Sequence, residues 1–356
     1  MSIRYIGSKA RLANSIVDLA GRPGRGRFVD AFSGTGSVAA AASSRGWTVV
    51  VNDALASAVA MSTGALVGRE NVPFSALGGY EAACMHLDDL SGHSGFLHHE
   101  YSPASESHAG VERRYFTEAN AARLDAMRSQ IASWSEAGLL TINEERLLLA
   151  DLIHAANRVA NISGTYGCFL SNWTSNALRP IELKPRELPD GSTKFEASMG
   201  DVFDVRVDNE DVVYYDPPYT KRQYAAYYHL METLVAGDQP KVGGITGLRP
   251  WRDKASDFSY KSRALATIRR LILSTPARRI LLSYSTEGHV DREQLLTTLS
   301  EVGSVQLHAV ETIGRYRPNA GAAAAGETVD EYVIEIEPFT VNEVVRRAAH
   351  QEAVYA

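Results

Sequence analysis

Cysteine is scarce in this chain, with Cys84 and Cys168 as the two thiols among 356 residues. Two thiols do not make a disulfide framework at this length, and the sequence has no CxxC pair or His/Cys cluster with the spacing of metal ligands. The N-terminus has no apolar signal stretch, and no run approaches the ~18 apolar residues that cross a bilayer. We therefore expect a soluble cytoplasmic protein with no metal and no membrane contact.

A surplus of positive charge is also lacking, since the formal net charge is −6. The distribution of charge is uneven, however. Residues 81–151 carry 12 acidic and 5 basic side chains, whereas residues 217–279 carry 12 Lys/Arg and 4 Asp/Glu. A basic segment of this kind suits a surface that faces phosphates, although a solvated surface with scattered arginines would look the same.

The strongest chemical signal is Asp216-Pro217-Pro218-Tyr219, which directly follows the apolar run 212–215. We expect it at the carboxyl end of a buried strand, where open α/β sheets bind ligands. A carboxylate that only accepts, two prolines without N–H donors and a flat aromatic ring suit a planar heterocycle with an exocyclic amine. The alternative is a strand that runs into a Pro-Pro turn, with Asp216 as a turn residue.

A second candidate site lies at residues 30–36, where a short strand turns into a helix. Gly34 and Gly36 let the backbone approach a ligand closely, but the pattern is neither GxGxxG nor a P-loop. Asp30 favours a cationic ligand group over a phosphate, and Asp53 ends the next strand, where a carboxylate can hold both hydroxyls of a ribose. S-adenosylmethionine fits this pattern; a strand-end cap and a turn residue are the structural alternatives for the two aspartates.

The order of predicted elements indicates an α/β fold interrupted by a helical segment. Strands are expected at 27–33, 48–51, 212–215 and 279–284, with a strand–turn pair at 195–205 and a terminal antiparallel pair at 305–313 and 331–336. Helices are expected at 38–42, 55–67, 223–236, 261–274 and 291–301. Between about 80 and 180 the pattern becomes a loop at 91–110 and helices at 112–135 and 143–161. We expect loops at 237–260 and at 318–326, the latter mobile.

In this order the segments resemble the alpha group, or Dam-type, of N6-adenine DNA methyltransferases over nearly the whole chain. The resemblance implies a Rossmann-like S-adenosylmethionine-dependent methyltransferase sheet made by residues 1–79 and 195–356. Residues 80–194 would be a mainly helical target-recognition insertion. Residues 3–9 resemble the family's N-terminal cofactor motif, residues 200–202 its adenine-binding motif, and residues 283–285 and 331–334 its later strands.

The resemblance also assigns roles to single residues. It implies that the cofactor is held by Tyr5, Lys9, Asp30, Phe32, Ser33, Gly34, Gly36, Asp53, Asp201 and Val202. It implies that catalysis belongs to Asp216, Pro217, Pro218 and Tyr219, which would receive an adenine flipped out of duplex DNA and present its N6 for methylation. Such enzymes serve restriction-modification or orphan methylation systems, so a separately encoded endonuclease is a candidate partner, and we expect a monomer.

Contacts to DNA are expected mainly from the basic residues after the catalytic motif: Lys221, Arg222, Arg249, Arg252, Lys254, Lys261, Arg315 and Arg317. Two features depart from the family. An alanine-rich stretch follows Arg317 where the family has a basic loop, and the insertion is acidic. On the helix predicted at 143–161, His154, Asn157, Arg158 and Asn161 share one face, which would either read DNA or form a polar seam.

Other functions remain open at the level of sequence. An adenine methyltransferase for RNA would use the same chemistry, and an N4-cytosine enzyme is disfavoured by aspartate at position 216. A catalytically silent DNA-recognition subunit with the same fold would not need Asp30, Asp53, Asp216 and Tyr219 together.

Overall fold

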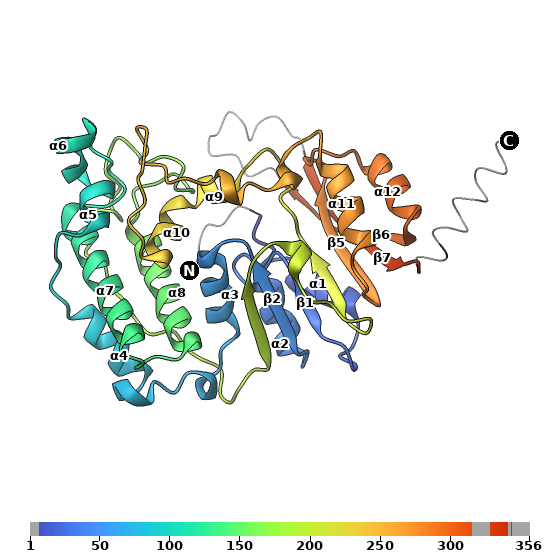
Figure 1. Cartoon of the computed structure of the whole chain (residues 1–356), viewed down its shortest axis with the longest axis horizontal. Helices are drawn as coiled ribbons and strands as arrows, with labels where there is room; N and C mark the ends of the chain where they lie inside the picture. Colours follow the sequence, from blue (N-terminus) through green and yellow to red (C-terminus); the bar gives the residue numbers. More distant parts are fainter. Residues whose placement is uncertain (1–6, 315–327, 341–342, 344–356) are drawn as a thin grey trace.

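The computed structural model describes residues 7–314, 328–340 and 343. Its centre is a seven-stranded sheet in the order β3-β2-β1-β4-β5-β7-β6 (Figure 1). The strands are β1 (Phe28–Asp30), β2 (Val49–Asp53), β3 (Phe195–Met199), β4 (Val212–Tyr215), β5 (Arg279–Ser285), β6 (Gly303–Gly314) and β7 (Thr328–Pro338). Strands β1 to β5 are parallel, and β7 is antiparallel to both β5 and β6. This confirms the predicted α/β sheet and its terminal antiparallel pair.

Helices cover both faces of the sheet. Helices α1 (Ala13–Ala20) and α2 (Ser37–Ser44) pack on one face, and α11 (Ala264–Leu273) and α12 (Arg292–Ser300) pack on the other. The central strands β1 and β4 are therefore buried along their whole length, which explains why their residues, apart from Asp30, are apolar without alternation. Because β1, β2 and β4 are parallel, the aspartates at or just after their carboxyl ends meet at one edge of the sheet.

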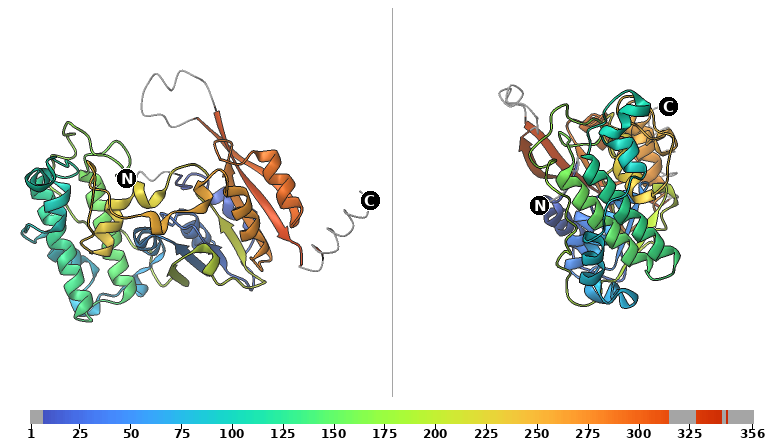
Figure 2. Two further views of the ribbon diagram at one scale, coloured as in Figure 1. Left: turned by 45° about the horizontal axis from the view of Figure 1, so that its top comes forward. Right: turned by 90° about the vertical axis from the view of Figure 1, so that its left-hand side faces the viewer.

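A helical part lies at the other end of the molecule, with α3 (Ala56–Leu66) and α10 (His229–Ala236) between it and the sheet (Figures 1 and 2). It contains α4 (Tyr80–Asp88), α5 (Phe96–Tyr101), α6 (Glu106–Ala109), α7 (Glu118–Glu136) and α8 (Ile142–Val159). One hydrophobic core joins α4, α5, α7 and α8 to α3 and α10. The predicted domain boundaries at residues 80 and 194 stay a prediction, but side chains from both sides of them share this core.

Short helical turns complete the described chain. They are α9 (Tyr224–Tyr227) and the 3-10 turns η1 (Arg69–Asn71), η2 (Ser75–Leu77), η3 (Pro103–Ser105), η4 (Val202–Asp204), η5 (Arg252–Lys254) and η6 (Asp257–Ser259). In the described part of the chain, no helix combines the length and the apolar character needed to cross a membrane. The linker predicted at 318–326 lies outside the described residues.

The structure differs from the predicted elements in several places. The loop predicted at 91–110 contains α5 and α6, and helices α1 and α4 were not predicted. Helix α5 begins where the Asp125 carboxylate of α7 accepts the backbone N–H groups of Gly95, Leu97 and His98 at 2.8–3.0 Å. This cap comes from a distant helix, so local sequence patterns do not reveal it. The helix predicted at 223–236 is divided at Tyr228 into α9 and α10.

Candidate functional site

A pocket of about 130 Å³ opens at the carboxyl ends of β1, β2 and β4. Nine of the residues that line it were predicted to bind the cofactor or to take part in catalysis: Lys9, Asp30, Phe32, Ser33, Gly34, Asp53, Val202, Asp216 and Pro218. The tertiary structure thus brings seven of the predicted cofactor residues to the same pocket as Asp216 and Pro218 of the predicted catalytic motif. Tyr5 lies outside the described residues.

The glycine turn after β1 is shaped by packing against α3. Gly34 and Gly36 have positive φ values of 49° and 76°. A Cβ atom on Gly36 would lie 2.6 Å from the Cα of Ser62 in α3, which is too close for any other residue without a backbone shift. Gly36 itself is not among the lining residues, so its role is to let α3 close against the turn.

Asp53, at the end of β2, holds the two walls of the pocket together. Its Oδ2 accepts the N–H of Gly34 at 3.0 Å, and its Oδ1 accepts the N–H of Leu55 at 3.0 Å. Burial raises the pKa of Asp53 to about 6, although these N–H groups favour the ionised form. The contact of Asp53 with a ribose stays a prediction. That contact requires the Asp53 side chain to line the pocket, and it does so.

Asp30 is a buried carboxyl group with an unsatisfied oxygen. It is 2% exposed, and its Oδ1 has no hydrogen-bond partner among the described residues. Burial and the nearby charge of Asp216 raise its pKa to about 8. The Oγ of Ser33, also buried, has no partner among the described residues either. An unpaired buried polar atom is costly, so both atoms fit a site that a polar, cationic ligand completes.

Asp216 forms an ion pair that the sequence did not predict. The Nζ of Lys9 lies 3.1 Å from Asp216 Oδ1 and 3.6 Å from Oε2 of Glu331, and the Lys9 side chain is 5% exposed. Burial raises the pKa of Asp216 to about 6; Lys9 opposes this rise and Glu331 adds to it. Burial alone would lower the pKa of Lys9, but the two carboxylates outweigh it and the pKa is raised. One buried cation is therefore shared by two carboxylates.

Glu331 is a site residue that the sequence indicated only as part of a strand. It lies on β7 opposite Ser285 of β5, and the hydroxyl of Tyr219 donates to its Oε1 at 3.5 Å. Lys9 Nζ also lies 5.3 Å from the centre of the Tyr219 ring. A charged residue directly before the buried run 332–334 was the signal that could have revealed it, because charges at such positions are seldom unpaired.

The remaining catalytic residues lie around this ion-pair cluster. Pro217 is buried and Pro218 lines the pocket, whereas Tyr219 is half-buried beside Lys9 and Glu331 and packs on Tyr284 with ring centroids 5.5 Å apart. Asp201 is exposed and is not among the lining residues; its Oδ1 accepts the N–H of Phe203 at the start of η4. Its predicted contact with a cofactor stays a prediction.

Lys254 was predicted to bind DNA, but the structure places it in the pocket wall. Its Nζ lies 2.7 Å from Oε1 of Glu232, a buried residue of α10. The same carboxylate accepts the N–H groups of Ala56 and Ser57, the first residues of α3, at 3.1 and 2.9 Å. A carboxylate at a helix N-terminus satisfies donors that the helix leaves unpaired. Lys254 therefore stabilises the α3–α10 junction, and this geometry does not favour a phosphate contact.

The other basic residues fall into three groups. Lys221, Arg222, Arg252 and Lys261 are exposed, as a phosphate contact requires. Arg249 is turned inward, because its side chain is 14% exposed and forms an ion pair with Asp238 at 2.8 Å. Arg315 and Arg317 lie outside the described residues. The exposed group keeps the prediction of DNA binding, whereas the geometry of Arg249 does not favour it.

The face of polar residues predicted on α8 is a polar seam within the protein at Asn161, which lies just after the end of the helix. Asn161 is fully buried; its Oδ1 accepts the N–H of Thr174 and its Nδ2 donates to Leu170 O, both at 3.0 Å. His154 is half-buried, and burial lowers its pKa to about 4. Arg158 is exposed and donates to the carbonyl of Glu182. Asn161 is therefore occupied within the chain rather than available to DNA.

Known proteins place this arrangement in context. The chain is 31% identical to modification methylase StsI of Streptococcus sanguinis over 97% of its own length and 53% of that relative. It is 30% identical to Type II methyltransferase M.FokI of Planomicrobium okeanokoites, covering 94% of the chain and 52% of the relative. The chain thus spans about half the length of these two relatives. For Type II methyltransferase M.NlaIII of Neisseria lactamica the identity is 29%, over 87% of the chain and 91% of the relative.

No solved structure matches the chain. The family model that matches it describes the D12 class N6 adenine-specific DNA methyltransferases, and the match runs over residues 5–297. This range includes the glycine turn, both pocket aspartates of β1 and β2, the helical part and the Asp216–Tyr219 motif. The chain therefore belongs to the D12 class N6 adenine-specific DNA methyltransferase family.

Proposed function

We propose that this chain transfers a methyl group from S-adenosylmethionine to N6 of an adenine flipped out of double-stranded DNA. The observation that carries the proposal is that Asp30, with its unpaired buried oxygen, and Asp216 line the same pocket. Within one cavity, Asp30 can then serve a cationic group of the cofactor and Asp216 the exocyclic amine of the base. One of the relatives is named as a modification methylase and two as Type II methyltransferases, which supports a role in protecting DNA from a separately encoded endonuclease.

The lining residues suit S-adenosylmethionine. Asp30 and Ser33 offer unsatisfied acceptor atoms, Asp53 offers a carboxylate at the end of β2, and Phe32 and Val202 offer apolar wall. When bound, this cofactor supplies an electrophilic methyl group on a sulfonium. The family uses a methyl donor of this kind in general, and the charge of Asp30 fits the cationic end of such a molecule.

Asp216 is suited to hold the amine of the target base. Lys9 lies next to Oδ1 of Asp216. The other carboxylate oxygen and the Pro217 carbonyl are left to accept hydrogen bonds from the two N–H groups of the amine. Accepting both hydrogen bonds would favour a pyramidal nitrogen, whose lone pair would then be available for methylation. Positioning and electrostatics would then supply most of the rate enhancement. Tyr219 would stack on the base, and extrusion of the base from the duplex costs a few kcal/mol.

The proposal is tested by transfer of tritiated methyl groups to duplex DNA and to structured RNA of the same sequence. We expect incorporation into DNA and far less into RNA. Asp216→Ala should abolish transfer while calorimetry still detects binding of S-adenosylmethionine. Asp190→Asn is a matched control, since the Asp190 side chain is 100% exposed and does not line the pocket. Normal DNA methylation by Asp216→Ala would contradict the proposed role, and transfer to RNA alone would contradict the substrate.

A further inference from the structure

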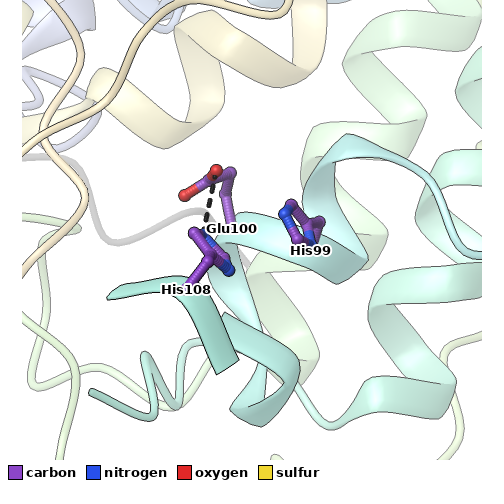
Figure 3. Close-up of side chains that lie close together, drawn as sticks. All are labelled: His99, Glu100 and His108. Atoms are coloured by element: carbon purple, nitrogen blue, oxygen red, sulfur yellow. Dashed lines mark ion pairs between the residues drawn. The ribbon is translucent and has the colours of Figure 1, made fainter. Parts of the chain in front are cut away.

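Two imidazoles and a carboxylate converge in the helical part, away from the pocket described above. His99 and Glu100 lie near the end of α5, and His108 lies in α6 (Figure 3). One possible ligand atom from each of the three lies within 4.8 Å of the other two. The imidazole rings are nearly parallel, with centroids 3.9 Å apart and an interplanar angle of 16°. The sequence alone showed no such cluster, because η3 and the following turn bring residue 108 back to residues 99 and 100.

The carboxylate is held in place before any ligand binds. Oε2 of Glu100 forms an ion pair with Arg113, a buried guanidinium that also donates to the carbonyl of Gly244 at 3.2 Å. The other oxygen, Oε1, lies 3.2 Å from Nε2 of His108. Metal-binding carboxylates are commonly oriented in this way by a second hydrogen-bonding partner. Oε1 therefore faces the imidazoles in a fixed orientation.

The imidazoles are accessible and keep unused ligand atoms. His99 and His108 are exposed, and no hydrogen bond to a ring nitrogen of His99 is found within the described residues. A cleft lined by Glu100, His108 and Arg113 runs beside the segment 242–245 and gives an ion access to the cluster. Neither ring is part of the hydrophobic core of the helical part. Because the lone pair of an imidazole nitrogen lies in the plane of its ring, one of the two stacked rings must rotate before both can ligate the same ion.

We propose that His99, Glu100 and His108 bind a zinc ion, with water completing a tetrahedral site. Two imidazole nitrogens and one carboxylate oxygen form a three-ligand set that zinc accepts, whereas magnesium and calcium prefer oxygen ligands alone. The positive charge of Arg113 makes the site weaker than a closed four-ligand structural site. The bound ion would tie the end of α5 to α6 across residues 100–108 and stabilise this corner of the helical part.

The test is calorimetric titration of the untagged full chain with zinc chloride after removal of chelators. We expect one zinc per chain, and a loss of affinity of about tenfold or more in His99→Ala and in His108→Ala. His93→Ala is the matched control, because His93 is an exposed histidine just before α5 and lies outside the cluster. Its affinity for zinc should equal that of the unsubstituted chain.

A second measurement separates binding from folding. Both substituted histidines are exposed, so the unfolding temperature without metal should differ little among the four proteins. Zinc should raise the unfolding temperature of the unsubstituted chain and of His93→Ala, and have a much smaller effect on the other two. Absence of zinc binding by the unsubstituted chain, or equal zinc affinity in His99→Ala and His108→Ala, would overturn the proposal.

Discussion

At the scale of single residues, the site is organised by Lys9, which pairs with both Asp216 and Glu331. The cation stabilises the ionised form of Asp216, whereas burial and Glu331 oppose that form. The protonation of the proposed amine-binding carboxylate therefore depends on a residue of β7 that has no place in the catalytic motif.

This arrangement predicts the effect of Glu331→Gln on pH dependence. Removal of the Glu331 charge lowers the pKa of Asp216, and Lys9 then serves Asp216 alone, which lowers it further. Because Asp216 must be ionised to accept the amine, the acid limb of the profile of kcat/KM against pH should move down by roughly 1 unit. Glu337→Gln, an exposed change on the same strand, is the control and should leave the limb in place. If the acid limb of Glu331→Gln stays in place or moves to higher pH, Glu331 does not control the pKa of Asp216 in this way.

The burial of Asp30 predicts that this carboxyl group lowers the stability of the fold while it favours binding of a cationic ligand. Its pKa of about 8 lies above the unfolded value, so the native state binds the proton more tightly. Its contribution to stability is thus present at acidic pH and is lost as pH rises through about 8. Asp30→Asn should raise the free energy of unfolding at pH 8 by about 2 kcal/mol, with a smaller gain at pH 5.

Urea unfolding at the two pH values measures this effect, and Asp204→Asn, at an exposed position, is the control. Calorimetry should show that Asp30→Asn binds S-adenosylmethionine more weakly. Unchanged stability at pH 8 would mean that Asp30 is not an unfavourable buried charge, and unchanged affinity would remove it from the cofactor site.

At the scale of elements, helix termini are held by carboxylates from distant helices. Glu232 of α10 caps α3, and Asp125 of α7 caps α5. The glycine turn is likewise defined by an element remote in sequence, because Gly36 is pressed against Ser62 of α3. The pocket wall therefore depends on how α3 and α10 pack rather than on the turn alone.

The close approach of α3 predicts the result of Gly36→Ala. The substitution combines a positive φ with a Cβ placed 2.6 Å from a backbone atom. Gly21→Ala is a matched control, since Gly21 has a similar φ of 79° but no atom within 4 Å of the added Cβ. Gly36→Ala should lose roughly 2 kcal/mol more stability than Gly21→Ala, because only the former forces a backbone shift. Equal losses in urea unfolding would show that conformational strain alone matters.

At the scale of the whole molecule, three regions far apart in the sequence meet at one site. Lys9, Asp216 and Glu331 come together because β7 inserts antiparallel beside β5 and brings its first half to the carboxyl edge of the parallel strands. The exposed basic residues Lys221 and Arg222 follow the catalytic motif at this edge. The sheet topology thus places proposed chemistry and proposed phosphate contacts together.

Salt dependence of binding to a mixed-sequence duplex distinguishes exposed from internal cations. Each phosphate that a protein neutralises adds about 0.9 to the magnitude of the slope of log K against log salt. The double change Lys221→Ala and Arg222→Ala should therefore weaken binding and reduce the slope by about 1 to 2. Arg249→Ala is the control and should leave the slope unchanged, because its guanidinium is paired with Asp238. A reduced slope in Arg249→Ala alone would reverse this assignment.

Much of the fold was predictable because buried parallel strands are continuous apolar runs. The runs at 49–51, 212–215 and 279–284 became β2, β4 and β5, and the chemistry of Asp30, Asp53 and Asp216 followed from their places at or after strand ends. The loop predicted at 91–110 was wrong in part, because the cap of α5 comes from Asp125. The prediction for Lys254 depended on net charge, which does not show whether a cation has a buried partner.

By itself, the sequence determined the sheet, the order of the motifs and the aspartates at the pocket, since these depend on short runs of neighbouring residues. The tertiary structure alone decided that Lys9 is shared by Asp216 and Glu331, that Lys254 and Arg249 are paired within the chain, and that His99, Glu100 and His108 converge. Ion pairs and ligand sets depend on distances of a few ångströms between segments. Those distances are set by strand order and helix packing, not by spacing along the chain.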